Sequence, residues 1–203
     1  MLKFIFCSII LLFGPTLWAT GNVLNSNPGV GVIAVAGDSL ARGRGATNPD
    51  NRTPGCFRQN FPGQVESFGV DGRTSYQLLG DLSEVEAVQP KLIFVSSGGN
   101  DAIKDFWFGF YPEERTLREM DEIFDRLLAT GAVVVYLGLN PPQKAAARLP
   151  KISALAASKG VLVVDGMQGL WGTDFMRDQF HPNDQGYQKM CARIVEALQP
   201  YYP

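Results

Sequence analysis

A serine and a histidine, far apart in the sequence, are the residues best suited to joint chemistry. Ser39 follows Gly37 and Asp38, and His181, the only histidine of the chain, comes three residues after Asp178. A serine hydroxyl becomes a nucleophile when a neutral imidazole takes its proton, and a carboxylate on the other ring nitrogen orients that imidazole. On a turn, the three-residue spacing lets Asp178 reach one ring nitrogen while the other faces Ser39. This pattern predicts nucleophilic catalysis; the alternatives are a helix-capping serine and a surface histidine that lies near an aspartate by chance.

Two glycine-containing segments supply candidate hydrogen-bond donors. Gly72 lies in a turn, where its backbone N–H can approach a ligand closely. Asn100 follows two glycines, and its side-chain amide can donate to a developing oxyanion. Each segment alone is at least equally consistent with an ordinary turn. Their occurrence together with the serine and the histidine, each after an expected strand, favours one shared site.

Five short apolar runs, rich in β-branched residues, predict buried parallel strands. They cover residues 30–36, 65–69, 92–96, 132–137 and 161–164. Helical patterns fill the gaps between them, and the first of these begins at a cap formed by Thr74 or Ser75. The helices are expected over residues 75–88, 117–131, 144–158 and 184–198. Alternation of strands and helices over the whole length predicts a three-layer α/β/α sandwich around a five-stranded parallel sheet.

The composition supports one folded domain and excludes several other classes of protein. Of the 203 residues, 45% are hydrophobic and 19% are charged, which excludes disorder, collagen-like repeats and coiled coil as the main structure. A formal net charge of -2 provides no basic field for nucleic acid. One histidine and three cysteines cannot form a zinc cage from spaced pairs. We therefore expect neither a nucleic-acid partner nor a metal or other cofactor.

The first 21 residues have the pattern of a cleavable export signal. Lys3 precedes an apolar run over residues 4–13, and small residues at 19–21 offer a cleavage point. A membrane anchor is the alternative, but the run is shorter than the roughly 20 residues that span a bilayer. We expect a cleaved signal peptide over residues 1–21, one domain over residues 22–203, and a periplasmic or secreted protein without a stable membrane anchor.

Four segments together resemble the sequence blocks of the SGNH (GDSL) hydrolases. The blocks, in family order over nearly the whole mature chain, are Gly37-Asp38-Ser39-Leu40, Gly72, Gly98-Gly99-Asn100-Asp101 and Asp178-Gln179-Phe180-His181. The resemblance implies a flavodoxin-like sandwich and the hydrolysis of esters or thioesters without a metal. It makes Ser39 the nucleophile, His181 the general base and Asp178 its orienting partner. It also implies an oxyanion hole formed by the backbone N–H groups of Ser39 and Gly72 with the side chain of Asn100.

Within that family, the size, the leader and the Asp-x-x-His-Pro-Asn ending are most similar to the small bacterial periplasmic thioesterase, lysophospholipase and arylesterase group. We therefore expect a monomeric serine hydrolase of acyl or aryl esters or thioesters, acting through an acyl-enzyme intermediate on a small-molecule or lipid substrate. One alternative is a carbohydrate O-acetylesterase acting on cell-wall or exopolysaccharide glycans. Another is a catalytically silent binding domain on the same scaffold.

Several segments depart from that group or stand out within the chain. Glycines and prolines over residues 43–55 predict a first helix that is short or displaced. The aromatic residues at 106–111 can line an acyl or aryl pocket beside the oxyanion hole, or they can cover the core or a helix end. Arg42 and Arg44, close to the serine, can meet an anionic group or remain solvated.

Cys56 and Cys191 are the two cysteines that remain once the leader is removed. In the expected topology the first and last helices flank the same face of the sheet, so a disulfide between these residues is possible in an oxidising compartment. Buried free thiols are the alternative, because the sequence does not determine the distance between them.

Overall fold

The computed structural model describes residues 22–141 and 147–203, so the predicted signal peptide lies outside the described residues. Five parallel strands form one sheet in the order β2-β1-β3-β4-β5. The strands are β1 (Gly31–Gly37), β2 (Gly63–Gly69), β3 (Leu92–Ser96), β4 (Val133–Leu137) and β5 (Leu162–Val164). Each strand begins and ends within two residues of its predicted range. The strand order is that of flavodoxin-like folds, so the predicted fold class is confirmed.

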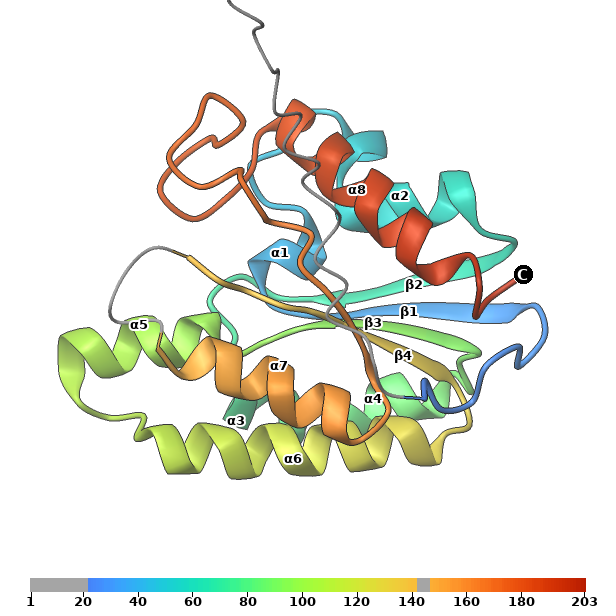
Figure 1. Cartoon of the computed structure of the whole chain (residues 1–203), viewed down its shortest axis with the longest axis horizontal. Coiled ribbons are helices and arrows are strands. Elements are labelled where there is room, and N and C mark those ends of the chain that lie inside the picture. Colours follow the sequence, from blue (N-terminus) through green and yellow to red (C-terminus); the bar gives the residue numbers. More distant parts are fainter. Residues whose placement is uncertain (1–21, 142–146) are drawn as a thin grey trace, which may run out of the picture.

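Helices cover both faces of this sheet (Figure 1). Those on one face are α1 (Ser39–Arg42), α2 (Thr53–Asn60) and α8 (Asp184–Leu198). Those on the other are α3 (Ser75–Gly80), α4 (Leu82–Ala87), α5 (Gly99–Phe108), α6 (Glu113–Ala129) and α7 (Arg148–Ser158). The carboxyl ends of the strands lie at the left of Figure 1, where α1, α5 and the segment between β5 and α8 gather. None of the described helices is long and apolar enough to cross a membrane.

The core lies on both faces of the interior strands β3 and β4, whose residues are all buried. Phe94 packs against Phe57 on the α2 side, with ring centroids 5.5 Å apart. Tyr136 packs edge-on against Phe124 on the α6 side at 5.4 Å, and its hydroxyl donates to a backbone carbonyl. Burial on two faces explains why these strands are continuous apolar runs in the sequence.

The prediction of one continuous helix over residues 75–88 is wrong, because the chain forms two helices there, α3 and α4. Asp81 separates them with a non-helical backbone (φ -99°, ψ 6°) and follows Gly80. Both residue types have low helix propensity. The Asp81 carboxylate also forms an ion pair with Arg73, which stabilises the break.

The other expected helices agree with the structure to different degrees. The helix over 184–198 has its predicted bounds, and α1 is short, as expected. Helix α6 begins at Glu113, four residues before its predicted start. Helix α7 begins at Arg148, and positions 144–146 of its predicted range lie outside the described residues. Helix α5 is absent from the sequence prediction, because its two leading glycines resemble a simple turn.

A disulfide joins Cys56 in α2 to Cys191 in α8, with their Cα atoms 5.7 Å apart. The two helices lie on the same face of the sheet (Figure 1), as the expected topology requires for this bridge. The bridge connects the segment after the first strand to the last helix of the chain, so it fixes two distant parts of the sequence to each other.

We expect the double substitution Cys56→Ala and Cys191→Ala to lower the free energy of unfolding. The bridge spans 135 residues, and closing a loop of that size restricts the unfolded chain by an amount worth about 2–5 kcal/mol. Urea unfolding of the wild type and the variant measures the difference. Dithiothreitol should shift the wild type to the variant's midpoint and leave the variant unchanged. A wild type insensitive to the reductant would contradict the prediction.

Candidate active site

The turn after β1 positions the candidate serine. At Gly37 the backbone φ is +127°, and a Cβ there would lie 1.9 Å from the carbonyl oxygen of Ser96, so a side chain is excluded. Asp38 follows as the N-cap of α1, and its carboxylate accepts the N–H of Leu40 at 2.9 Å. The capping role that the sequence permits for Ser39 therefore belongs to Asp38. The Ser39 hydroxyl is available for another partner.

That partner is His181, which lies in the segment between β5 and α8. Its Nε2 is 2.8 Å from Oγ of Ser39, and its Nδ1 is 3.0 and 2.9 Å from the two carboxylate oxygens of Asp178. The structure thus brings together the three residues that the sequence singles out. With the proton on Nδ1, the lone pair of Nε2 faces the serine hydroxyl, which is the orientation that proton abstraction requires.

The turn around Asp178 keeps its carboxylate charged. Partial burial opposes ionisation, but hydrogen bonds from the backbone N–H of Phe180 and from the His181 ring outweigh it and hold the pKa of Asp178 below its usual range. The backbone N–H groups of Phe180 and His181 both donate to Oδ1 at 2.8 Å. An ionised carboxylate at this place fixes the imidazole tautomer and can stabilise an imidazolium.

Asn100 and Gly72, which carry the other predicted oxyanion donors, line the same cavity as Ser39. Asn100 lies in the first turn of α5, and its amide nitrogen donates one hydrogen to the carbonyl of Arg73 at 3.0 Å. A side-chain amide has two hydrogens, so the second remains for a ligand. Gly72 has φ +74°, while a Cβ there would meet no atom within 4 Å. Glycine is therefore favoured at position 72 by its backbone conformation rather than by close packing.

The cavity has a volume of about 720 Å³, within the usual range for small-molecule sites. Its apolar wall includes Ile103, Phe106, Trp107, Leu139, Leu149 and Trp171. Within the aromatic stretch at 106–111, Phe106 and Trp107 line the cavity and Phe108 and Phe110 do not, and all four side chains are largely exposed. Leu139, Leu149 and Trp171 are not predicted from the sequence, since they come from three segments that only the tertiary structure brings to the site.

The two arginines near the serine are ion-paired and exposed. Arg42 and Arg44 both donate to Oδ2 of Asp71, at 3.0 and 3.3 Å. More than half of each arginine side chain is accessible, and Arg44 lines the cavity. The structure therefore places one guanidinium at the cavity, neutralised in part by Asp71.

Asp38 is a buried carboxyl group at the site, and its role there is not predicted from the sequence. Its Oδ1 also accepts the hydroxyl of Ser96 at 2.9 Å, and burial raises the pKa of Asp38 to about 6. Aspartate is a favoured N-cap residue, and Asp38 lies two residues before Leu40, whose N–H it accepts. Its capping role therefore has a signal in the sequence. Its burial depends on contacts with β3, and no sequence pattern reports those.

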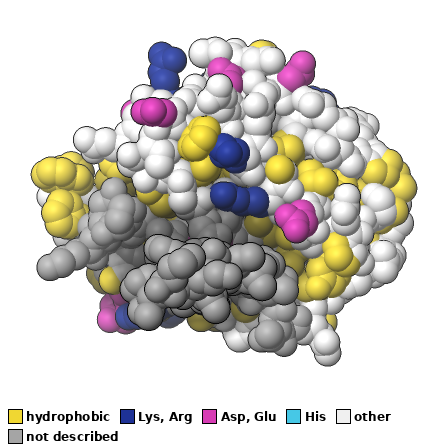
Figure 2. All heavy atoms as spheres, turned by 45° about the horizontal axis from the view of Figure 1, so that its top comes forward, with side chains coloured by type: hydrophobic (Ala, Val, Ile, Leu, Met, Phe, Trp, Pro, Cys, Tyr) yellow, Lys and Arg dark blue, Asp and Glu magenta, His cyan; other side chains and the backbone are white. Residues whose placement is uncertain are grey.

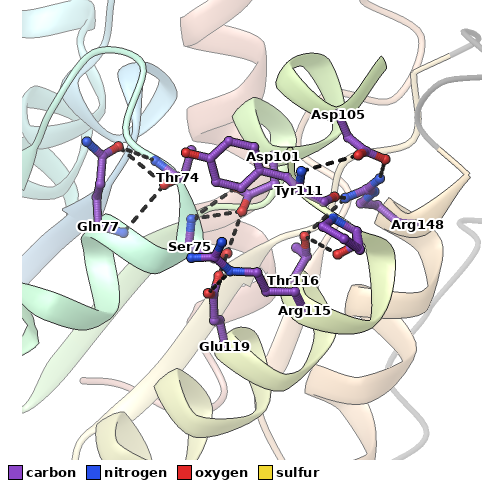
Figure 3. A network of polar contacts seen from close by, with 11 residues as sticks. Thr74, Ser75, Gln77, Asp101, Asp105, Tyr111, Arg115, Thr116, Glu119 and Arg148 are labelled. Atoms are coloured by element: carbon purple, nitrogen blue, oxygen red, sulfur yellow. Dashed lines mark hydrogen bonds and ion pairs between the residues drawn. The ribbon is translucent and has the colours of Figure 1, made fainter. Parts of the chain in front are cut away.

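A polar network fixes the segment with the Gly72 turn to α5 and α6 (Figure 3). The Ser75 N–H donates to Asp101 at 3.0 Å, and the Ser75 hydroxyl lies 2.5 Å from Asp101 and 2.6 Å from Glu119. The Ser75 hydroxyl has one hydrogen and can donate it to only one of these two carboxyl groups. Burial raises the pKa of Asp101. Asp101 adjoins Asn100, and Ser75 follows the turn that contains Gly72. The network therefore holds both candidate oxyanion donors in place.

A flavodoxin-like sheet with a serine and a histidine in hydrogen-bond contact beyond its carboxyl edge has the architecture of the SGNH-type hydrolases. Residues 35–189 match the model of the GDSL-like lipase/acylhydrolase family, and the chain therefore belongs to this family. Membership supports an enzyme that hydrolyses ester bonds. The comparison with curated proteins gives no match.

Several solved structures share the fold. TesA superposes with a TM-score of 0.72 at 19% identity, over 85% of this chain and 99% of that one. A GDSL-like lipase from Bacteroides thetaiotaomicron gives 0.67 at 23% identity, over 84% and 87%. Axe2, an acetylxylan esterase from Geobacillus stearothermophilus, gives 0.67 at 13% identity, over 85% and 95%. At these identities the likeness shows the fold, and the substrates of these proteins do not transfer to this chain.

We expect Asp38→Asn to stabilise the protein at pH 7. The folded-state pKa of about 6 lies above the ordinary value of 3.8, so stability falls as the pH rises between these values, by about 3 kcal/mol in total. Asparagine keeps an oxygen that can accept the Leu40 N–H without the cost of a buried charge. Urea unfolding at pH 7 and near pH 4 should show the gain only at the higher pH. An equal gain at both values would contradict this cause.

Proposed function

We propose that the chain is a serine-dependent hydrolase of carboxylic esters or thioesters, with Ser39 as nucleophile, His181 as general base and Asp178 as its orienting partner. One observation carries the proposal. A continuous chain of hydrogen bonds runs from the Asp178 carboxylate through the imidazole to the Ser39 hydroxyl, at the wall of a largely apolar cavity. The spacing and order of these groups match what nucleophilic acyl transfer requires.

In the first step, Oγ of Ser39 attacks the carbonyl carbon of the bound ester, and its proton passes to Nε2 of His181. A bond forms between Oγ and carbon, and the electron pair of the carbonyl moves to its oxygen. Asp178 stabilises the imidazolium that results, and it remains ionised because its pKa lies below the usual range.

The oxyanion formed in this step is stabilised by three donors: the backbone N–H groups of Ser39 and Gly72 and one amide hydrogen of Asn100. The bond from Asn100 to the Arg73 carbonyl orients that amide before substrate arrives. Donors that are fixed in advance contribute most when they face charge that develops in the transition state.

Collapse of the tetrahedral intermediate breaks the bond to the alcohol or thiol, and His181 returns the proton to that leaving group. The acyl group is then attached to Ser39. A water molecule, deprotonated by His181, attacks this acyl-enzyme, and a second collapse releases the carboxylic acid and restores the serine. No step requires a metal or cofactor, because each role falls to a side chain or a backbone N–H.

For the substrate we propose an acyl or aryl ester larger than an acetate. The apolar wall formed by Ile103, Phe106, Leu139 and Leu149 supports this choice, because acetate would leave most of that surface in water. This proposed substrate agrees with the resemblance to the thioesterase, lysophospholipase and arylesterase group. Hydrolysis of O-acetyl groups on glycans is the alternative. The protein would act as a monomer on a small-molecule or lipid ester and would not bind nucleic acid.

We also propose that the protein is exported, with residues 1–21 removed as a signal peptide. The bridge between Cys56 and Cys191 supports export, because disulfides persist mainly in oxidising compartments. The mass of the protein recovered from the periplasm or medium tests this, and an intact leader on that protein would contradict it.

Ser39→Ala and His181→Ala should each lower kcat by about a thousandfold or more, because each removes a group that forms or breaks bonds. Asn100→Ala should lower kcat by about a hundredfold or more, through loss of one oxyanion donor. Steady-state hydrolysis of p-nitrophenyl butyrate measures all three effects. Circular dichroism controls for folding, and EDTA should leave the rate unchanged. A fully active His181→Ala protein would refute the mechanism, since the chain has no second histidine.

The dependence on acyl chain length tests the substrate class. We expect kcat/KM for p-nitrophenyl esters to rise from acetate to butyrate or octanoate, because a longer chain covers more of the apolar wall. Ile103→Asp, which places a charge on that wall, should reduce the rate on octanoate more than the rate on acetate. Activity confined to acetate in the wild type would favour the glycan O-acetylesterase instead.

A further inference from the structure

Four aromatic side chains project into solvent at the end of α5. Phe106, Trp107, Phe108 and Phe110, here called the aromatic tip, are 65–71% exposed, more than any other large hydrophobic side chain among the described residues. Figure 2 shows hydrophobic side chains projecting at the left edge of the molecule, on the side where α5 ends in Figure 1. Aromatic side chains that stay in water do not gain the free energy that burial would provide. Clusters of them mark interaction surfaces more often than isolated ones do.

The rings are grouped in pairs and continue into the candidate active site. The ring centroids of Phe106 and Trp107 are 5.3 Å apart, and those of Phe108 and Phe110 are 6.2 Å apart. The first pair also lines the cavity that contains Ser39. An apolar surface therefore runs from the outside of the molecule to the proposed nucleophile.

The charges of α5 favour an anionic occupant. Asp101 is buried, and Asp105 is paired with Arg148. Lys104 donates to the carbonyl of Gly72 and has no carboxylate partner among the described residues. Helix α5, which carries three of the four rings, therefore presents one basic side chain that no carboxylate of the described residues pairs with.

We propose that the aromatic tip docks on an anionic lipid surface. Aromatic side chains partition into the interface between headgroups and acyl chains, and basic residues beside them are attracted to anionic headgroups. Three of the four rings are phenylalanine and have no polar atom for the hydroxyls of a sugar, which favours lipid over glycan. Binding through four rings would be reversible, as for other proteins that bind only the membrane surface.

Docking in this orientation would place the cavity mouth at the lipid surface. An ester with a long acyl chain could then move from the lipid along Trp107 and Phe106 toward Ser39 without exposing its chain to water. This consequence rests on the proposed function, whereas docking itself does not. Vesicle binding by a protein with the Ser39→Ala substitution therefore tests the surface separately from the chemistry.

The experiment compares Ser39→Ala protein, residues 22–203, with the same protein carrying Phe108→Ser and Phe110→Ser. These residues include every buried core residue that the structure describes, from Ile33 to Tyr202. Phe108 and Phe110 do not line the cavity. With vesicles of phosphatidylcholine and phosphatidylserine, we expect the bound fraction in flotation to fall about tenfold in the variant and to be lower on vesicles without phosphatidylserine.

A matched control removes exposed hydrophobic side chains elsewhere. Leu24→Ser with Val30→Ser changes two such residues that precede β1, at the edge of the sheet opposite the cavity, and should leave vesicle binding unchanged. In a Trp171→Phe background, the emission of Trp107 should shift to shorter wavelength when vesicles are added. With Ser39 intact, the Phe108→Ser and Phe110→Ser protein should hydrolyse dissolved p-nitrophenyl butyrate as fast as its parent.

Three results would overturn the proposal. One is equal vesicle binding by the parent and the tip variant, or an equal loss in the control. Another is a parent protein that does not bind vesicles but forms dimers that the tip substitutions abolish, which would assign the surface to a second copy of the chain. The third is tip-dependent binding to acetylated xylan without binding to vesicles, which would assign it to a glycan.

Discussion

A parallel sheet brings the carboxyl ends of all its strands to one edge, and the candidate site depends on this constraint. Ser39 follows β1, the Gly72 turn follows β2, Asn100 follows β3, and the segment with Asp178 and His181 follows β5. In the observed strand order the chain leaves β1 toward β2 on one side and returns as β3 on the other, and ligands bind at such a switch point. Serine and asparagine therefore face one cavity because of topology, before any side-chain contact is considered.

Much of this arrangement is predictable from residues next to strand ends. Five apolar runs identify the strands, and Ser39 and Asn100 follow the ends of β1 and β3 by only a few residues, so both must lie near the carboxyl edge of the sheet. His181 lies farther from the end of β5, and it is identified instead as the only histidine of the chain, three residues after an aspartate. The break at Asp81, the helical start at Asn100 and the cavity wall at Leu139 and Leu149 are not predictable in this way. They depend on contacts between segments that the sequence separates, such as the ion pair of Asp81 with Arg73.

Buried acidic groups give the site its rigidity. Asp38 caps the helix that carries the serine, and Asp101 holds the segment of the Gly72 turn through Ser75. Burial raises the pKa of both carboxyl groups, so each is retained at some cost in stability. The aromatic tip shows the opposite arrangement, because its apolar side chains remain in solvent at the other end of the same helix. One helix, α5, thus connects a rigid donor site to an exposed surface.

The hydrogen bond between His181 and Ser39 joins residues 142 positions apart. During synthesis, Ser39, Gly72 and Asn100 leave the ribosome long before His181. The chain cannot form that bond until the segment after β5 has been made. The disulfide that ties α2 to α8 likewise needs the last part of the chain, since Cys191 follows the histidine. An incomplete or prematurely ended chain would accordingly hold a hydroxyl without its base, and hydrolysis would begin only in a finished molecule.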